Sequence, residues 1–157
     1  MGAGVQTTLR PATRDDIDLL VAWHADPEVS RFWDGKVYSR EELLEKFRRE
    51  RWLPFIVEEH GVPVGYLQQW WEADDPTVAG LDGFLIPSAR GRGVMPAAAR
   101  RLAERLLAEG FAEVTVDPYA WNERALRGWA NAGFVEVSRH PPDDGHTAEW
   151  VLMRFSG

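Results

Sequence analysis

The sequence predicts one α/β (or α+β) domain, in which a mixed β-sheet is flanked by helices on both faces. Segments with strand and helix periodicity follow one another in the order β-α-α-β-β-β-α-β-α-β-β, as expected for helices packed on a sheet. The 157 residues are enough for one hydrophobic core and too few for two, and no repeat or linker divides them. We therefore treat residues 1–157 as a single domain.

Two helices are predicted in the first third of the chain from their capping boxes. Thr13 with Asp16, and Ser39 with Glu42, each form such a box before an apolar run. The first helix should bury one face, made of Ile17, Leu20, Val21 and His24. Between the two helices, residues 26–38 form a polar and aromatic connection.

Two further helices are predicted in the second half. Pro96 in a first turn and Gly110 after the last turn bracket the longer one. Its core stripe is Ala99, Leu102, Ala103, Leu106 and Leu107. Asn122 should cap the other helix, which Gly133 closes. Its inward side chains are Ala125, Leu126 and Trp129.

The predicted strands are short apolar runs bounded by turn residues. They are residues 55–58, 62–70, 80–86, 113–116, 134–138 and 148–155. His60-Gly61 is the expected hairpin turn between the first two. Residues 71–79 are expected to form an acidic loop.

Composition limits the function classes. The net charge of −7 argues against a nucleic-acid partner and suits a cationic ligand, although solubility alone also explains an acidic surface. Cysteine is absent and the four histidines are scattered, so no metal site is predicted. No stretch has the length of a membrane helix and no signal region begins the chain, so a cytoplasmic protein is expected.

The most informative segment is Arg90-Gly91-Arg92-Gly93, which lies between a predicted strand and a predicted helix. Glycines before a helix let the backbone approach a ligand, and the unpaired N–H groups of the first turn bind phosphate. The two arginines add charged donors. The segment therefore indicates a phosphate-bearing ligand, with a plain helix-capping loop as the alternative.

This segment resembles the acyl-CoA motif of the GNAT superfamily of N-acetyltransferases, Q/R-x-x-G-x-G/A. Arg90, Gly93 and Met95 stand at its positions, with Met95 in place of the last small residue. Asp117-Pro118, Asn122 and Ala132-Gly133-Phe134 match the second part of the pattern in order and spacing. The resemblance covers residues 8–153 and implies the GNAT fold, with acetyl-CoA as the only cofactor.

The resemblance also implies which residues contact the coenzyme. They are Phe84, Leu85, Ile86, Arg90, Gly91, Arg92, Gly93, Val94, Met95, Asn122, Ala125 and Trp129. Trp129 stands where GNAT enzymes commonly have a tyrosine that protonates the leaving thiolate. An indole is no acid at neutral pH, so Tyr119, water or unassisted departure remain as alternatives.

Within the superfamily the chain is similar to the aminoglycoside 6′-N-acetyltransferases. The matching segments are Trp70-Trp71-Glu72, Asp75-Pro76, residues 80–85, Asp117-Pro118 and Asn122. The N-terminal part, with Trp23, residues 26–29 and Phe32-Trp33, also resembles siderophore-type hydroxylysine acyltransferases. In those a histidine stands at the position of Asp82, so Asp82 favours the aminoglycoside branch.

Acetylation of an amine needs a group that removes a proton from the ammonium. Asp82 is the expected catalytic base, because a charge in an apolar strand is costly unless it is paired or functional; a solvated strand face is the alternative. Asp117 follows a buried strand, so it is either a second catalytic and substrate-binding carboxylate or the cap of the following turn.

Further substrate contacts are expected from turns and aromatic residues. Asp143 and Asp144 lie in a Pro/Gly turn and either serve that turn or, by analogy with the family, bind the substrate's ammonium groups. Trp33 and Trp71 either pack against sugar rings or belong to the core.

We therefore predict an acetyl-CoA-dependent N-acetyltransferase that modifies a primary amine of an aminoglycoside, with the 6′-amine as the expected position and antibiotic resistance as the expected context. One alternative is an acyltransferase for another amine, such as a siderophore hydroxylysine, a polyamine or a protein N-terminus. Another is a GNAT-like domain that binds ligand without turnover. The expected partner is a small cationic amine, with neither nucleic acid nor membrane, and the protein is expected to be a monomer or a homodimer.

Overall fold

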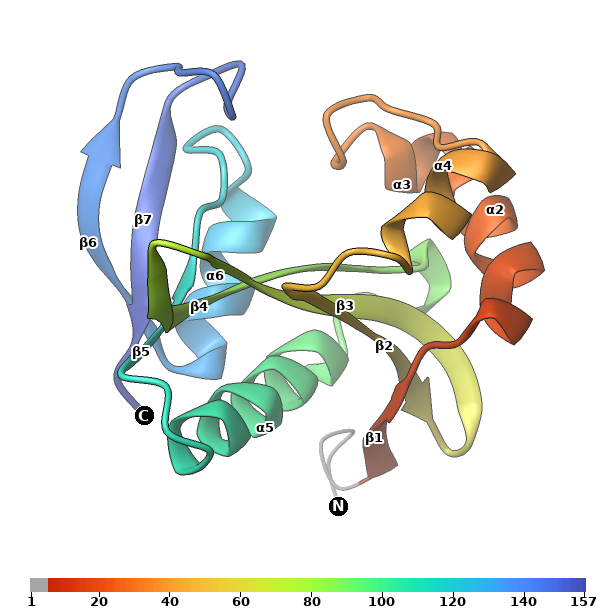
Figure 1. The fold of residues 1–157 in the computed structure, drawn as a ribbon, viewed down its shortest axis with the longest axis horizontal. Helices are drawn as coiled ribbons and strands as arrows, with labels where there is room; N and C mark the ends of the chain where they lie inside the picture. The colour runs from red at the N-terminus through yellow and green to blue at the C-terminus, as the bar shows by residue number, and fades with distance from the viewer. Residues whose placement is uncertain (1–5) are drawn as a thin grey trace.

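The computed structural model describes residues 6–157, and its centre is a seven-stranded sheet in the order β1-β2-β3-β4-β5-β7-β6 (Figure 1). The strands are β1 (Thr7–Pro11), β2 (Trp52–Glu59), β3 (Val62–Glu72), β4 (Asp75–Leu85), β5 (Glu113–Val116), β6 (Phe134–His140) and β7 (Trp150–Phe155). β4 and β5 run parallel, and every other pair of neighbours is antiparallel. The sheet is therefore mixed, as predicted.

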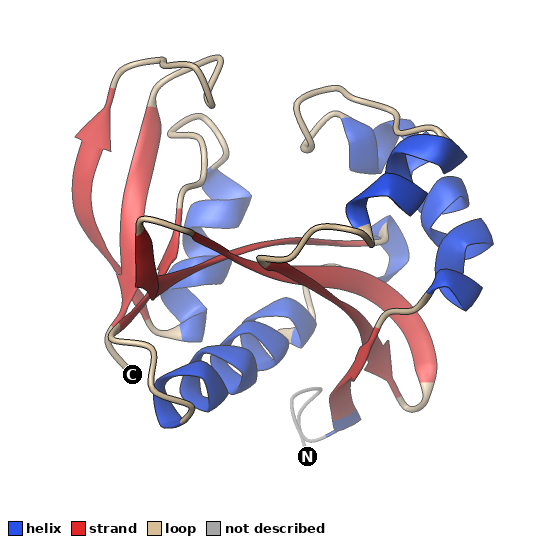
Figure 2. Ribbon diagram, viewed as in Figure 1, coloured by secondary structure: helices blue, strands red, loops and turns tan. Residues whose placement is uncertain are grey.

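Helices cover both faces of this sheet (Figure 2). They are α2 (Ile17–Ala25), α3 (Pro27–Ser30), α4 (Arg40–Lys46), α5 (Val94–Ala108) and α6 (Glu123–Ala132), with short 3₁₀ turns at Arg14–Asp16 and Pro87–Ala89. Strand alternation divides the core: Phe55 and Val57 of β2 pack with α5, whereas Ile56 packs with α2 and α4. The predicted arrangement of helices on both faces is thus confirmed.

The sheet splits between its two parallel strands. β4 pairs with β5 only from Val78 to Gly80, opposite Glu113 to Thr115. Residues 81–85 of β4 continue along β3 instead, in register with residues 65–69. Because β5 has no strand partner on that side beyond Thr115, a wedge opens between the two strands. The residues that line this wedge form the candidate site.

Local signals placed most element boundaries correctly. The capping boxes of Thr13 with Asp16 and of Ser39 with Glu42 are both formed. His60 and Gly61 have φ of 53° and 77°, the left-handed conformation of the predicted tight turn. α5 ends at Ala108, just before Gly110.

Three expectations were wrong. Residues 71–79 are no loop, because β3 runs to Glu72 and β4 begins at Asp75, so that cross-strand pairing extends almost to the turn. Leu107 is 38% exposed and lies outside the core stripe of α5. The connection over residues 26–38 contains the short helix α3, which Asp26 caps with Pro27 at its first turn. Within residues 6–157, the helices are too short or too polar to cross a membrane.

Candidate active site

A cavity of about 510 Å³ is lined by residues of β4, of the start of α5 and of α6. Its lining residues are Phe32, Gly83, Phe84, Leu85, Arg90, Gly91, Gly93, Met95, Pro96, Asn122, Arg124, Ala125, Arg127, Gly128, Trp129 and Asn131. Most of the predicted coenzyme contacts are among them. The cavity is not lined by three of the predicted contacts, Ile86, Arg92 and Val94. Val94, the first residue of α5, is fully buried in the core.

The backbone of the turn before α5 is not covered by side chains at Gly91 and Gly93. Gly91 and Gly93 have φ of 84° and 76°, and a Cβ at either position would meet no atom within 4 Å. Gly93 is the N-cap residue of α5 and supplies no side chain to the first turn. The N–H groups of that turn therefore have no side-chain acceptor at the cap, the arrangement that favours an anion.

The two arginines of this turn contact the protein itself. The Arg90 guanidinium donates to the backbone oxygen of Glu28 at 2.6 Å and to that of Leu85 at 3.3 Å. Arg92 pairs with the carboxylate of Glu59. Arg90 still lines the cavity, whereas Arg92 does not.

Two cations that sequence reasoning missed also line the cavity, Arg124 and Arg127 of α6. Their spacing of three residues on one helix was the available signal. The cavity is therefore lined by apolar side chains, by the uncapped N-terminus of α5 and by three arginines. These features fit an elongated ligand with an apolar arm and phosphate groups.

Asp82 of β4 lies beside this cavity and lines a second one, of about 550 Å³. The second cavity is lined by Arg49, Glu50, Arg51, Trp52, Gln68, Trp70, Trp71, Glu72 and Asp82. The indole Nε1 of Trp70 donates to Asp82 Oδ2 at 3.1 Å. Trp70 packs so closely on Gly80 that a Cβ there would lie 2.3 Å from its ring.

Burial raises the pKa of Asp82 to about 8, and the negative charge of Asp117 adds to this effect. Hydrogen bonds from Trp70 and Gln68, and the positive charge of Lys46, oppose the rise. A carboxylate in this environment holds a proton more tightly than an exposed aspartate does. Asp82 is therefore suited to take up a proton near neutral pH.

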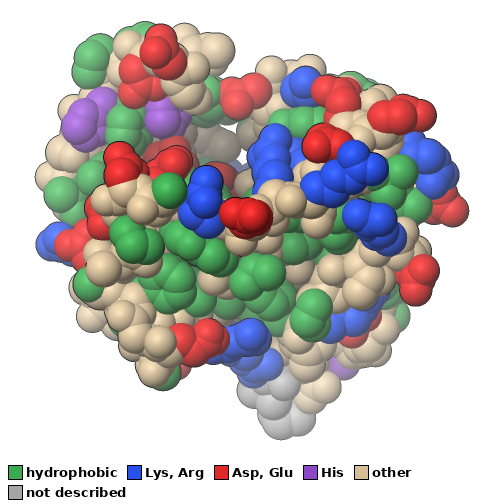
Figure 3. Space-filling view, in the orientation of Figure 1, with side chains coloured by type: hydrophobic (Ala, Val, Ile, Leu, Met, Phe, Trp, Pro, Cys, Tyr) green, Lys and Arg blue, Asp and Glu red, His purple; other side chains and the backbone are tan. Residues whose placement is uncertain are grey.

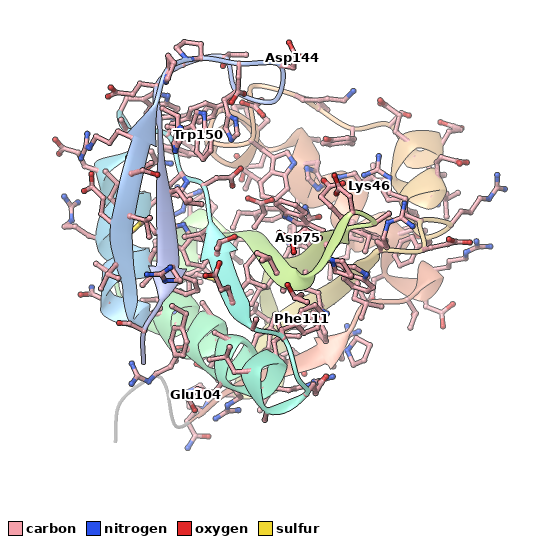
Figure 4. The ribbon with its side chains drawn as sticks, turned by 60° about the vertical axis from the view of Figure 1, so that its left-hand side comes forward. Lys46, Asp75, Glu104, Phe111, Asp144 and Trp150 are labelled. Atoms are coloured by element: carbon pink, nitrogen blue, oxygen red, sulfur yellow. The ribbon has the colours of Figure 1, made fainter. Side chains whose placement is uncertain are left out.

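Asp117 follows β5 and bonds to a residue that the sequence did not single out. His146 Nε2 lies 2.7 Å from Asp117 Oδ2, and His146 Nδ1 lies 2.8 Å from Asp143 Oδ1. Trp150 Nε1 donates to the other oxygen of Asp143 at 3.0 Å. Asp144 is exposed in the same turn. Asp117 and Asp143 are thus held close together, at the end of the sheet where Figure 4 shows Trp150 and Asp144.

The two tryptophans expected at the substrate have different surroundings. Trp33 packs edge-on against His24, Tyr66 and Phe84, so it belongs to the core beneath α2 and α4. Trp71 lines the second cavity and contacts Phe111 edge-on. Of the two, Trp71 lines one of the two cavities described above, and Trp33 lines neither.

Tyr119, considered as a proton donor, lies outside both cavities. Its hydroxyl donates to Asp34 Oδ1 at 2.5 Å, and burial raises its pKa. This bond joins the segment before α4 to the segment after β5. Trp129 lines the first cavity but is 9% exposed and packs edge-on against Phe134.

Lys46 at the end of α4 is a further residue that the sequence did not indicate. It is 6% exposed, and its Nζ lies 4.1 Å from the ring centre of Tyr38. Burial lowers the pKa of Lys46 to about 8, whereas Asp82 acts in the opposite direction. In Figure 3, histidine and acidic side chains lie on the left of the hollow at the top of the molecule, and basic and acidic side chains lie together on its right.

A family described as an acetyltransferase (GNAT) domain matches residues 12–141. The chain belongs to the GNAT acetyltransferase family. This confirms the predicted fold and the predicted enzyme class, an acetyl-CoA-dependent N-acetyltransferase.

Solved structures of GNAT enzymes superpose over nearly the whole chain. The structure of AAC(6')-Ib with paromomycin and acetyl-CoA is 28% identical, with a TM-score of 0.83 over 96% of this chain and 93% of that one. The same acetyltransferase with coenzyme A and kanamycin is 27% identical, with a TM-score of 0.82 over 94% and 93%. Spermidine N-acetyltransferase from Vibrio cholerae, with CoA and spermine, shares the fold at 18% identity and a TM-score of 0.82 over 96% and 95%.

Proposed function

We propose that this GNAT enzyme transfers the acetyl group of acetyl-CoA to a primary amine of an aminoglycoside, at the 6′ position. The observation that carries the proposal is Asp82, a carboxylate with a raised pKa that lines the cavity next to the coenzyme cavity. The similarity to AAC(6')-Ib, at 28% identity over nearly the full length, supports the substrate class.

The first cavity is the proposed coenzyme site. The turn containing Gly91 and Gly93, with Arg124 and Arg127, would hold the phosphates. Met95 and Trp129 would contact the apolar arm. When bound, acetyl-CoA supplies an activated acetyl thioester that is open to attack by a neutral amine.

Asp82 has the role of base. A substrate amine arrives mostly as an ammonium ion at neutral pH, and its nitrogen attacks only after losing a proton. Asp82 accepts that proton, directly or through water. A pKa of about 8 suits this transfer, because the proton affinities of carboxylate and amine are then similar. Asp117 and Asp143, with Asp144 in the same turn, would bind further ammonium groups of a polycationic substrate.

A second acceptor class is favoured by the mixed charges of the second cavity. Arg49 and Arg51 line it together with Glu50 and Glu72, and buried Lys46 acts electrostatically on Asp82. An acceptor that carries a carboxylate as well as an amine, such as free hydroxylysine, would find a partner for each charge. The same cavity would therefore distinguish a simple polyamine from a free amino acid.

The test measures thiol release from acetyl-CoA with kanamycin, spermidine and hydroxylysine, followed by identification of the acetylated nitrogen by mass spectrometry and NMR. We expect the highest kcat/KM with kanamycin and modification of its 6′-amine. A higher kcat/KM with hydroxylysine would replace the first assignment by the second. Binding of acetyl-CoA without thiol release on any amine would show a non-catalytic domain.

A further inference from the structure

His146 is the residue that connects the two acidic segments of the acceptor site. Asp117 comes from the end of β5, and Asp143 from the turn between β6 and β7. The imidazole lies between them, with Nε2 at 2.7 Å from one carboxylate and Nδ1 at 2.8 Å from the other. The side chain of His146 is 16% exposed, whereas those of Asp117 and Asp143 are 27% and 46% exposed.

The ring is fixed in its plane by its neighbours. Trp150 stacks on one face at 4.2 Å between ring centres and 11° between planes. Tyr119 contacts the ring edge-on. The backbone of the turn is closed as well, because Asp143 and His146 exchange N–H···O bonds of 3.0 and 3.2 Å. Few rotamers are therefore open to His146, and both ring nitrogens keep facing oxygen.

These contacts determine the protonation state that fits best. An ionised carboxylate only accepts hydrogen bonds, so both bonds of His146 form only when both ring nitrogens carry a proton. The titratable groups facing the ring are Asp117 and Tyr119 from the segment after β5 and Asp143 from its own turn, with His140 beyond Trp150. The two carboxylates raise the pKa of His146 in spite of burial.

We propose that His146 is a positioning residue that sets both the geometry and the charge of the Asp117–Asp143 pair. As imidazolium it holds the two carboxylates together and cancels one of their negative charges. As neutral imidazole it loses one of the two bonds, and the pair then presents both charges to an ammonium group of the substrate. Affinity for a polyammonium acceptor therefore rises as His146 loses its proton.

The inference rests on the proposed function, because the pair must receive a substrate ammonium group. It goes beyond that function by assigning the pH response of acceptor binding to one imidazole. By linkage, a bound polyammonium acceptor lowers the proton affinity of His146 to the same extent. Acceptor binding should therefore release protons in the pH range where His146 titrates.

The experiment measures KM for kanamycin from pH 5.5 to 8.5 in wild type, His146→Gln and His140→Gln. His140 is the matched control, since it also stacks on Trp150, at 4.3 Å between ring centres, but bonds to Ser138 rather than to a carboxylate. Dividing each variant's KM by the wild-type value cancels the pH dependence that comes from the amines of kanamycin, since it is the same for every variant. We expect the ratio for His146→Gln to rise by about fivefold from acidic to alkaline pH, the effect of one nearby charge, and that for His140→Gln to stay constant.

Calorimetry of wild type and His146→Gln with kanamycin, in buffers of different ionisation enthalpy, provides a second measurement. Asp82, with a pKa of about 8, releases protons on binding in both proteins, so a larger release near neutral pH in wild type than in His146→Gln supports the inference, and an equal release overturns it. A constant KM ratio for His146→Gln, or an equal slope for His140→Gln, overturns it while leaving the proposed function intact. Failure of kanamycin to bind or to be acetylated overturns the proposed function and this inference together.

Discussion

Asp82 and Asp117 occupy equivalent positions on the two parallel strands that separate at the site. Gly80 pairs with Thr115 at the last paired position of β4 and β5, and each aspartate is the second residue beyond it. Asp82 lies within β4, whereas Asp117 lies just beyond the end of β5. Burial, together with the nearby negative charge of Asp117, raises the pKa of Asp82, and five predictions concern this pair and the coenzyme turn.

Asp82→Asn should lower kcat on kanamycin by roughly 10²- to 10⁴-fold, the usual contribution of a general base. The loss should shrink as pH rises, because more of the acceptor then arrives as neutral amine. KM for acetyl-CoA should change little. Wild-type kcat at neutral pH in this variant would make Asp82 structural and move the role to Asp117 or to water.

The stability of the same variant, Asp82→Asn, tests the pKa of Asp82 without any measurement of catalysis. The pKa of Asp82 is raised on folding, so its ionisation costs stability progressively as pH rises from the ordinary aspartate value to about 8. Asp82→Asn should therefore melt at a higher temperature than wild type at pH 9, and the difference should vanish near pH 3. A lower melting temperature at pH 9 would contradict the assigned pKa.

Asp117→Asn should move the rising limb of the kcat/KM profile to lower pH by about one unit. The physical reason is that removing the negative charge of Asp117 makes ionisation of Asp82 easier. The measurement is kcat/KM for kanamycin across pH 6 to 10, relative to wild type. An unchanged midpoint would show that the two carboxylates do not interact.

Trp70→Phe should move the rising limb of the kcat/KM profile to higher pH, the opposite direction to Asp117→Asn. Phenylalanine keeps most of the ring that packs on Gly80 but removes the N–H that donates to Asp82 Oδ2 at 3.1 Å. This bond favours the ionised carboxylate, so its loss should raise the pKa of Asp82 and move the limb to higher pH by about one unit. A shift to lower pH, in the direction expected for Asp117→Asn, would contradict the assignment.

Gly93→Val should weaken acetyl-CoA binding by about tenfold or more while changing the KM for kanamycin far less. A side chain here would be strained at φ 76° and would stand at the start of α5 beside the cavity. Gly110→Val is the matched control: φ is 112°, a Cβ meets no atom within 4 Å, and the residue follows the other end of α5. Equal loss of acetyl-CoA binding in both would place the phosphates elsewhere.

The sequence determined the fold class, because its signals are local. Capping boxes, the His60-Gly61 turn and apolar periodicity each act within a few residues, so they mark elements without reference to the rest of the chain. The glycine turn before α5 and the isolated carboxylate Asp82 were also recognisable. The extent of β3 and β4 was not, since acidic residues 72–75 resemble a loop until cross-strand pairing orders them.

Only the tertiary structure decided which side chains meet at the site. Residues 117, 143 and 146 come together because the end of β5 and the turn before β7 adjoin, and no sequence period connects them. Arg92, in the turn before α5, resembled a phosphate ligand but pairs with Glu59 at the end of β2. Lys46, which the sequence did not indicate, is buried near Asp82. Charges interact through space, so their partners and pKa values depend on long-range packing that local sequence does not encode.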